Sequence, residues 1–462
     1  MQDKRYGTLL DEQRNFFSTG TTLSIHFRIE QLKKLKAIIQ NNESAIVAAL
    51  RKDLHKSEME SVVTEIIIVT DEIDHIIKNL KKWSKPTKVP SPFPLCWPGK
   101  SEIHHEPYGS VLIIGPWNFP FMLIMSPLIG AICAGNCAIV KPSEIASHTQ
   151  DMIVGLINNH FPSEYITAIK GGPQEVTRLL DEKFDYVFFT GGTQIGKIIL
   201  EAAARHLTPV TLELGGKSPC IVDETANLDF AARRIVWGKL MNAGQVCLAP
   251  DYLYVHHSCK TALVEKLIAA VKKFYGDDPS KSSSYCKIIN KRHFDRLTRL
   301  LKNGNILYGG STSEPDLYIA PTLIDNVSWT DPVMQEEIFG PILPILTYDN
   351  LEDVIKTVNS HPKPLSLYLF TKNKHHEKNV LKHVSFGGGC INDCLLQIAN
   401  YHLPFGGVGS SGLGAYHGKY SFETFSHRKS IFRKSPPIDL ALEYPPYTRK
   451  KLVWLKRLLK LG

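Results

Sequence analysis

The chain has 462 residues, of which 43% are apolar, and a formal net charge of +9. This length exceeds what one hydrophobic core normally supports, so we expect two or three folded units. Nine cysteines, an odd number spread along the chain, exclude the dense disulfide framework of a small secreted protein and predict reduced thiols in the cytoplasm.

The excess of positive charge is confined to the C-terminal end. Residues 428–462 hold ten basic and two acidic side chains, a balance of +8, which leaves +1 for residues 1–427. A nucleic-acid-binding protein usually spreads basic charge over a folded face. We therefore expect no nucleic-acid partner and treat residues 436–462 as a separate basic, amphipathic tail.

The N-terminal part of the chain is predicted to be helical. Its first residues are charged and no apolar stretch follows them, so no secretory signal is expected. Apolar residues at three- and four-residue spacing predict amphipathic helices over 23–53 and 58–84. The proline-rich stretch that begins at Pro86 cannot lie inside a helix and predicts an extended arm or an edge strand.

Residues 111–140 carry no charge and are long enough to cross a bilayer. Pro116, Pro120 and Pro127 argue against one continuous helix over this stretch. A strand, a turn, a helix and a second strand bury the same side chains in an α/β core. We expect this second arrangement and not a membrane span.

From residue 109 onward, short apolar strands alternate with helical segments, which is typical of a doubly wound parallel sheet with helices on both faces. We therefore predict an α/β fold in which residues 1–85 and 104–213 form a Rossmann-like cofactor-binding domain. The predicted strands are 111–114, 137–140, 166–170, 186–189 and 210–214.

A second α/β unit, the predicted catalytic domain, spans residues 214–398. Segments 86–103 and 399–435 are predicted to form a small bridging or oligomerisation arm. Inside the second unit we predict helices at 227–242 and 260–275 and strands near 251–255 and 364–370.

Two further patterns resemble a phosphate-binding loop and a metal site, and we expect neither kind of site. The glycine-rich segment 404–412 lacks the Lys-Ser/Thr pair that closes a phosphate loop, so we predict a tight surface loop near the site. The pairs Cys133/Cys137 and Cys390/Cys394 have CxxxC spacing and no neighbouring histidine. We therefore predict no metal site.

The strongest chemical signal is Cys247, which ends the run 242–247, together with Glu213, 34 positions upstream at the end of an apolar strand. A cysteine in a glycine-containing loop and a lone carboxylate supply a nucleophile and a base for acyl chemistry. A buried, inert thiol is the alternative for Cys247. A solvated strand end is the alternative for Glu213.

Polar residues also follow the first strands of the predicted sheet. Asn118 lies in a proline-constrained turn, where its amide can donate to a developing oxyanion or cap a helix. Lys141 and Glu144 follow the next strand and can hold a ribose or form a surface ion pair. Gly191 and Gly192 open a helix after a strand, where free N–H groups can bind a pyrophosphate.

Six motifs in this order make the chain resemble an aldehyde dehydrogenase along its whole length. A short N-terminus, Ala-Pro-Asp-Tyr at 249–252 and Tyr-Pro-Pro-Tyr at 444–447 are similar to the class 3 branch, which includes fatty aldehyde dehydrogenases. The six motifs are GPWNFP at 115–120, KPSE at 141–144, FTG at 189–191, LELGGK at 212–217, GQVC at 244–247 and EEIFGP at 336–341.

The resemblance implies that Cys247 attacks an aldehyde while Asn118 and the Cys247 backbone N–H hold the oxyanion. A hydride then leaves for a nicotinamide cofactor, and Glu213 activates the water that releases a carboxylic acid from the thioester. Further roles implied by the resemblance concern the cofactor: Lys141 and Glu144 hold the adenosine ribose, Glu337 holds the nicotinamide ribose, Phe339 lies beside the ring, and Trp117, Gly191 and Gly192 line the cofactor path.

NAD is the expected cofactor because the 2′-phosphate of NADP would meet the Glu144 carboxylate. Class 3 relatives often use both cofactors, so NADP stays open. Two positions depart from the family: Gly192 stands where Ser or Asn is common, and Phe119 stands where class 3 relatives have tyrosine. Both departures concern the fit of ligands and not the reaction type.

We expect a homodimer that acts on medium- to long-chain aliphatic aldehydes in the cytoplasm. Residues 448–461 form an amphipathic segment; fourteen helical residues extend about 21 Å, less than the roughly 30 Å core of a bilayer. The segment can therefore lie on a membrane surface. Packing on the protein itself or on a dimer mate is the alternative.

Two other functions are considered. A CoA-acylating dehydrogenase transfers the acyl group to a thiol, and such enzymes often lack the carboxylate found here at Glu213. A non-catalytic membrane-associated protein of the same fold is the second alternative, because a fold alone does not give a function. The joint presence of Cys247, Asn118, Glu213 and Glu337 argues against it.

Overall fold

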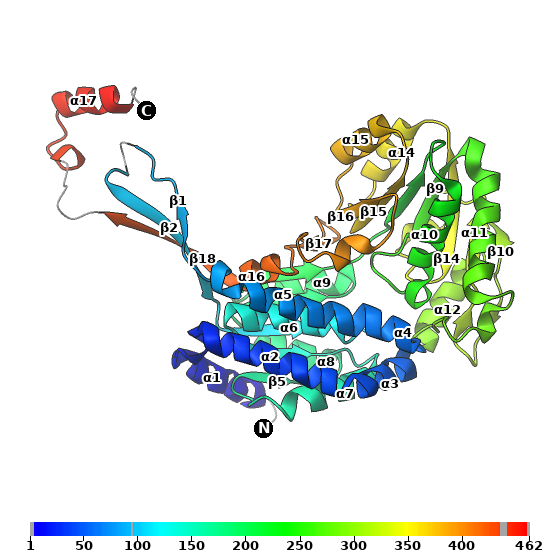
Figure 1. Ribbon diagram of the computed structural model, residues 1–462, viewed down its shortest axis with the longest axis horizontal. Coiled ribbons are helices and arrows are strands. Elements are labelled where there is room, and N and C mark those ends of the chain that lie inside the picture. Colours follow the sequence, from blue (N-terminus) through cyan, green and yellow to red (C-terminus); the bar gives the residue numbers. More distant parts are fainter. Residues whose placement is uncertain (1–3, 94–95, 435–440, 460–462) are drawn as a thin grey trace.

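The computed structural model describes residues 4–93, 96–434 and 441–459. Two main sheets organise the chain, one of six strands in the order β17-β7-β6-β3-β4-β5 and one of seven in the order β10-β13-β14-β9-β8-β15-β16. A three-stranded arm, β1-β2-β18, projects away from both sheets (Figure 1). The predicted α/β fold class is confirmed.

The six-stranded sheet contains the five strands predicted from the apolar runs. These five strands pair in parallel. A short strand from near the C-terminus, β17 (Gly412–Leu413), pairs antiparallel with β7 and forms the other edge. The parallel strands are β3 (Ser110–Ile114), β4 (Cys137–Lys141), β5 (Ile166–Ala168), β6 (Tyr186–Thr190) and β7 (Val210–Glu213).

The N-terminal helices pack in a layer on this sheet, where α2, α5 and α6 contact one another (Figure 1). The segment predicted as one helix over 23–53 is two helices, because Asn42 leaves the helical conformation. The helices of this region are α1 (Lys4–Ser18), η1 (Thr21–Leu23), α2 (Ile25–Asn41), α3 (Glu43–Leu54), α4 (Glu58–Ser61), the π-helical η2 (Val62–Ile67), α5 (Ile68–Trp83), α6 (Met122–Ala134), α7 (Ser147–Asn158), α8 (Pro173–Asp181) and α9 (Thr193–Ala204).

The uncharged segment 111–140 forms β3, α6 and β4, as predicted. Pro127 lies inside α6 and does not end it. A proline removes one backbone donor, and here every residue of the helix is buried, so packing on all sides holds the helix. Within the described residues, the structure contains no helix of the length and apolarity that a membrane span needs.

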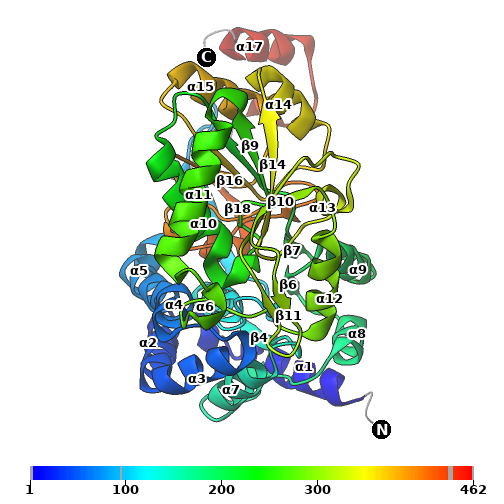
Figure 2. The ribbon, with the colours of Figure 1, turned by 90° about the vertical axis from the view of Figure 1, so that its right-hand side faces the viewer.

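The seven-stranded sheet is parallel except for β10, which pairs antiparallel with β13. Helices α10 and α11 lie side by side along it (Figure 2). Its strands are β8 (Pro219–Val222), β9 (Tyr252–His256), β10 (Asn305–Tyr308), β13 (Thr322–Asp325), β14 (Ile342–Tyr348), β15 (Ser366–Phe370) and β16 (Gly388–Ile391); β11 (Thr312–Ser313) and β12 (Tyr318–Ile319) form a separate pair.

The predicted helix 227–242 ends early. Residues 242 and 243 adopt left-handed conformations that an α-helix cannot continue. The helices of this unit are α10 (Leu228–Leu240), η3 (Met241–Gly244), η4 (His257–Cys259), α11 (Lys260–Tyr275), η5 (Pro279–Lys281), α12 (Lys291–Leu300), α13 (Pro332–Gln335), α14 (Leu351–Asn359), α15 (Lys374–His383) and η6 (Leu396–Ala399).

The arm consists of β1 (Thr87–Val89), β2 (Gly99–Pro107) and β18 (Ser426–Lys434). Its first predicted segment, 86–103, ends too early, because β2 stays paired with β18 as far as Pro107. Its second segment, 399–435, starts too early: β17 belongs to the six-stranded sheet, and α16 (Lys419–Thr424) packs on α6.

The tail contains η7 (Ala441–Glu443) and α17 (Arg449–Leu459). Figure 1 shows α17 apart from both main sheets, beyond the arm. Residues 436–440 and 460–462 of the predicted tail, and the final two positions of the predicted amphipathic segment 448–461, lie outside the described residues.

Candidate functional site

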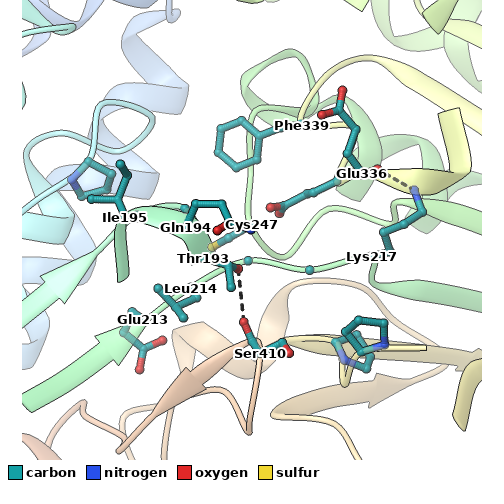
Figure 3. Close-up of a pocket in the computed structure, with 18 of the residues that line it drawn as sticks. Thr193, Gln194, Ile195, Glu213, Leu214, Lys217, Cys247, Glu336, Phe339 and Ser410 are labelled. Atoms are coloured by element: carbon teal, nitrogen blue, oxygen red, sulfur yellow. Dashed lines mark hydrogen bonds between the residues drawn. The ribbon is translucent and has the colours of Figure 1, made fainter. Parts of the chain in front are cut away.

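A cavity of about 770 Å³ lies between the two main sheets and brings most of the predicted site residues together. Part of its lining is drawn in Figure 3. Lys141 and Glu144 are not among the residues that line it. The predicted residues that do line it are Trp117, Asn118, Gly191, Gly192, Glu213, Cys247, Glu337 and Phe339.

Cys247 is carried by a tightly turned loop, residues 242–247, which we call the Cys247 loop. Asn242, Ala243 and Gly244 have φ values of 49°, 51° and 75°. Left-handed conformations are costly for residues with a Cβ, so other contacts must hold this loop. The Cys247 side chain is partly exposed to the cavity.

The environment of Cys247 raises the pKa of its thiol. Burial is the main cause, and the nearby carboxyl groups of Glu337 and Glu213 add to it. The thiolate is the reactive form of cysteine. The resting site therefore holds a neutral thiol at physiological pH.

Asn118 lies just after β3 and is 2% exposed. Its side-chain Nδ2 donates a hydrogen bond of 3.0 Å to the carbonyl oxygen of Gln245. An amide nitrogen carries two hydrogens, so a second hydrogen remains for a ligand oxygen in the cavity. The contact with Gln245 ties this amide to the Cys247 loop.

Glu213 ends β7 and is 2% exposed. Neither of its carboxyl oxygens has a hydrogen-bond partner in the structure. Burial raises the pKa of this carboxyl well above its usual value. In the view of Figure 3 the carboxyl group points away from the Cys247 sulfur.

Glu337 and Phe339 lie shortly before β14 of the seven-stranded sheet and line the same cavity. The Glu337 carboxyl is buried, its Oε1 has no partner, and burial followed by the charge of Asp251 raises its pKa to about 8. Phe339 has a φ of 50°, and its ring meets that of Trp117 edge to face, with centroids 5.3 Å apart.

The predicted cofactor-binding residues after β4 and those after β6 differ in their surroundings. Lys141 is 2% exposed, and its Nζ donates to the Glu144 carboxylate at 2.9 Å. A Cβ added at Gly192 would meet no atom within 4 Å, whereas one at Gly191 would lie 2.5 Å from the Phe189 ring. Both glycines directly precede α9.

These residues fit a dinucleotide. The unpartnered Oε1 of Glu337 can accept hydrogen bonds from ribose hydroxyls, and the start of α9 offers free N–H groups to phosphate. The open space beside Gly192 leaves room at the same helix terminus. Glu144 is 39% exposed and can reach a hydroxyl while it stays paired with Lys141.

Comparison with known families identifies the chain. Residues 5–431 match the model of the aldehyde dehydrogenase family. The chain belongs to the aldehyde dehydrogenase family. It is therefore an oxidoreductase that oxidises aldehydes with NAD or NADP, as the motifs predict.

Curated relatives cover nearly the whole aldehyde dehydrogenase chain. The 4,4′-diaponeurosporen-aldehyde dehydrogenase of Staphylococcus aureus is 50% identical over 441 residues, which cover 95% of this chain and 96% of that protein. The dimeric, NADP-preferring aldehyde dehydrogenase of Mus musculus is 46% identical over 445 residues, 96% and 98% of the two chains. Members of family 3 are also similar, so the predicted class 3 resemblance is confirmed.

Solved aldehyde dehydrogenases share the fold. A substrate-bound Staphylococcus aureus AldH superposes with a TM-score of 0.95 at 48% identity, over 98% of this chain and 99% of that one. A putative aldehyde dehydrogenase from Anabaena variabilis has a TM-score of 0.86 at 26% identity, over 96% and 95%.

Several cavity residues of the aldehyde dehydrogenase were not predicted. The ring of His293 lies tilted beside that of Trp117, with centroids 4.7 Å apart, and burial lowers the pKa of His293 to about 4. Ser410, from the glycine-rich loop 404–412, accepts a hydrogen bond from Thr193 through its carbonyl oxygen at 3.2 Å. The loop therefore lies at the site, as predicted, but Ser410 has no sequence signal beyond its glycine neighbours.

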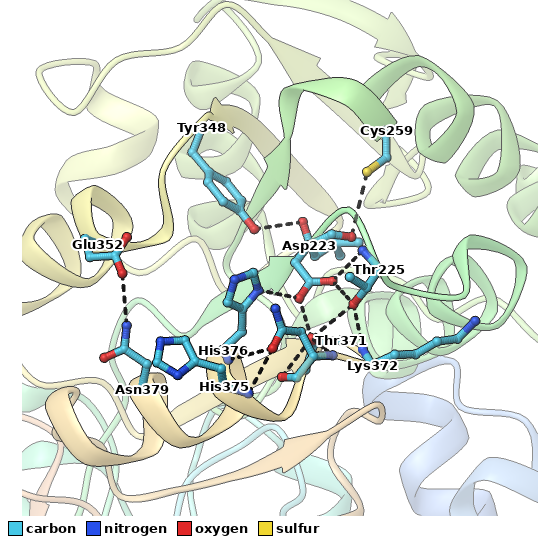
Figure 4. A network of polar contacts seen from close by, with 12 residues as sticks. Asp223, Thr225, Cys259, Tyr348, Glu352, Thr371, Lys372, His375, His376 and Asn379 are labelled. Carbon is cyan, nitrogen blue, oxygen red and sulfur yellow. Dashed lines mark hydrogen bonds and ion pairs between the residues drawn. The ribbon is translucent and has the colours of Figure 1, made fainter.

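A polar network outside the cavity includes three residues that could ligate a metal, Asp223, Glu224 and His376 (Figure 4). The Asp223 carboxylate already accepts hydrogen bonds from the side chains of Thr225, Thr371 and His376. These contacts tie β8 to the end of β15 and the start of α15. The network has a structural explanation without an ion.

Proposed function

We propose that the enzyme oxidises aldehydes through a covalent intermediate on Cys247. The observation that carries this proposal is that Cys247, Asn118 and Glu213 line one cavity. The sulfur forms a bond to the aldehyde carbon, and the oxyanion that develops accepts hydrogen bonds from the free hydrogen of the Asn118 amide and the Cys247 backbone N–H. The thiol proton is released to solvent, so the oxygen stays an oxyanion until the hydride leaves.

When bound, NAD or NADP accepts the hydride that leaves the substrate carbon. The carbon then stays bound to Cys247 as a thioester. Glu213 takes a proton from water as the water oxygen bonds to the carbonyl carbon, the C–S bond breaks, and the carboxylic acid and the thiol are released. For this step the Glu213 carboxyl must turn toward Cys247 and lose its own proton.

The cofactor contacts belong to the same proposal. Glu337 would hold the nicotinamide ribose and Lys141 with Glu144 the adenosine ribose, with Phe339 and Trp117 beside the ring. Gly191 and Gly192 would admit the pyrophosphate to the start of α9. These assignments are supported by the unpartnered Glu337 oxygen and the open space at Gly192.

Rapid mixing with an aldehyde and NAD, acid quenching and mass spectrometry test the proposed mechanism. We expect an acyl adduct on Cys247 in the wild type and none in Cys247→Ala, which should lose activity. Glu213→Gln should accumulate the adduct, because formation of the thioester does not need the base. Steady-state turnover retained in Cys247→Ala would falsify the mechanism.

We further propose medium- to long-chain aliphatic aldehydes as substrates and a homodimer as the functional form. The name of the Staphylococcus aureus relative refers to a diaponeurosporen-aldehyde, which supports the substrate class. The name of the mouse relative describes it as dimeric, which supports the homodimer. Aldehydes of 2 to about 18 carbons with NAD and NADP, followed at the absorbance of the reduced cofactor, test the substrate range. Sedimentation equilibrium tests the dimer.

We also propose that the enzyme is cytoplasmic and that its tail attaches to a membrane surface. Helix α17 exposes apolar side chains to solvent, and its 11 residues include basic ones. An amphipathic helix with basic residues binds anionic lipid surfaces. Flotation with anionic liposomes should separate the full chain from a chain truncated after Tyr447; equal flotation contradicts this proposal. The exposed apolar residues of α17 are Leu452, Val453, Trp454 and Leu459.

A further inference from the structure

The Cys247 loop depends on contacts from a distant part of the chain. Asn242, its first residue, is fully buried and left-handed. Its backbone N–H donates a hydrogen bond of 2.7 Å to Oε1 of Glu60, a residue of α4 that lies 182 positions earlier. The second oxygen of Glu60 accepts a weaker contact from the Cys286 thiol at 3.5 Å. Both oxygens of this carboxylate are therefore directed into the protein.

The same network reaches the Asn118 turn. The carbonyl oxygen of Asn118 accepts hydrogen bonds from Nδ2 of Asn242 at 2.8 Å and from Nζ of Lys56 at 3.2 Å. Lys56 is fully buried and ion-paired with Glu65. Asn242 thus joins Glu60 directly to the turn that carries the predicted oxyanion donor.

Glu65 fixes the other side of that turn. Its carboxylate accepts hydrogen bonds from the backbone N–H groups of Phe121 and Met122, at the start of α6. A carboxylate at a helix N-terminus is favourably placed. Lys56 thus lies beside Glu65 and close enough to Glu60 to stabilise its charged form, against the burial that raises the pKa of Glu60.

Removing the Glu60 carboxylate would leave the buried Asn242 N–H without a partner. An unpaired buried donor is unfavourable, and a left-handed residue keeps its conformation only where its surroundings hold it. Asn242 would relax toward a conformation that satisfies its N–H. Because Asn242 also contacts the Asn118 turn, both the Cys247 loop and that turn would shift.

We propose that Glu60 is a positioning residue that acts through Asn242 to hold the Cys247 thiol and the Asn118 amide in the geometry needed for acylation. The inference rests on the proposed function, since it assigns those two groups to the acylation step. Glu60 itself does not touch the aldehyde in this account.

Three single variants test the role of Glu60. Glu60→Ala removes the acceptor, Glu60→Gln keeps one acceptor oxygen, and Glu58→Ala changes an exposed glutamate on the same helix. The rate of the first turnover, the KM for NAD and the melting temperature are measured for each. We expect Glu60→Ala to slow the first turnover about 10- to 100-fold, as for other small misplacements of reacting groups, with an unchanged KM for NAD.

Glu60→Gln should restore most of that rate, and Glu58→Ala should match the wild type. A wild-type first-turnover rate in Glu60→Ala overturns the proposal, even if its melting temperature falls, because the role is then only structural. If Glu60→Ala does not fold, Glu60→Asp, with a carboxylate one methylene shorter, is judged by the same rate.

Alkylation separates this inference from the proposed mechanism. Mass spectrometry gives the rate at which iodoacetamide labels Cys247. This measurement needs neither aldehyde nor turnover. We expect Glu60→Ala to change this rate and Glu58→Ala to leave it unchanged; equal labelling in all variants counts against Glu60. Turnover retained in Cys247→Ala rejects the mechanism itself, whatever the Glu60 variants do.

Discussion

The Tyr368 hydroxyl group donates a hydrogen bond of 2.7 Å to the carbonyl oxygen of Leu248, the residue that follows Cys247. Tyr368 is fully buried on β15, and Gln397 donates to its hydroxyl oxygen from the other side at 3.2 Å. Strand β15 of the seven-stranded sheet therefore holds the residue that directly follows the Cys247 loop.

Tyr368→Phe removes this hydrogen bond and keeps the ring. We expect the free energy of unfolding to fall by about 1 to 3 kcal/mol, because the buried Leu248 carbonyl and the Gln397 amide each lose a partner. Activity should fall by about tenfold or less, since 1.4 kcal/mol corresponds to a factor of ten. Urea unfolding and kcat/KM check both; a loss of stability without loss of activity would show that Leu248 does not set the position of Cys247.

The raised pKa of the Cys247 thiol predicts how its reactivity depends on pH. Since the thiolate reacts, labelling by iodoacetamide should become faster with pH up to at least about pH 9. Glu337 adds to this rise once it is ionised, above its own pKa of about 8, so Glu337→Gln should speed labelling most at about pH 9. A profile that is flat between pH 6 and 9 contradicts the raised pKa.

Glu213→Gln should change stability in a way that depends on pH. The pKa of Glu213 is higher in the folded chain than in the unfolded one, so its contribution is fully present below about pH 4, near the unfolded value, and is lost as pH rises. Glutamine does not titrate. The melting temperature of the variant minus that of the wild type should therefore increase from pH 5 to pH 8. Turnover of the variant should be slower than that of the wild type.

Two glycine substitutions should separate cofactor binding from folding. In Gly215→Ala the new Cβ would lie 2.0 Å from the Glu337 carboxylate oxygen and displace it. We expect the KM for NAD to rise several-fold. Gly155→Ala, in α7, is the control, because its Cβ meets open space and Gly155 does not line the cavity. Equal KM values for both variants would argue against a role of Glu337 in binding the cofactor.

Glu144→Gln should shift cofactor preference toward NADP. The substitution removes the negative charge that opposes the 2′-phosphate and leaves Lys141 free to pair with it. Because Glu144 is 39% exposed, solvent screens the charge and the shift should be modest, about tenfold or less in the ratio of kcat/KM values. An unchanged ratio would place the adenosine ribose away from Glu144.

The parallel strands of the first sheet could be predicted from the sequence because each is a short, uninterrupted apolar run that turn residues delimit. The presence of Cys247, Glu213 and Asn118 in one cavity could be predicted because each stands in a sequence motif, with Glu213 and Asn118 at strand ends. Helix α1 was missed, since its helical conformation depends on packing: Tyr6 and Leu10 are its buried apolar residues in the smaller core cluster.

The contacts around the Cys247 loop could not be predicted. Glu60 and Glu65 are charged residues in an amphipathic helical segment, where such residues usually face solvent, and Lys56 lies in the link just before it. Only the fold shows that Glu60 contacts a loop 182 positions away and that Lys56 and Glu65 contact the Asn118 turn and the start of α6. The left-handed conformation of Asn242 likewise has no strong local signal, because its tertiary contacts impose it.

The pairing of β17 with β7 has a consequence for synthesis. Glu213 lies opposite Gly412, so the strand that carries the proposed base lacks one neighbour until the ribosome has released residues beyond 412. Domains generally fold from the N-terminus as the chain emerges. A nascent chain can therefore form most of the first sheet early, yet it cannot enclose Glu213, and so cannot become an active enzyme, until nearly the whole polypeptide has left the exit tunnel.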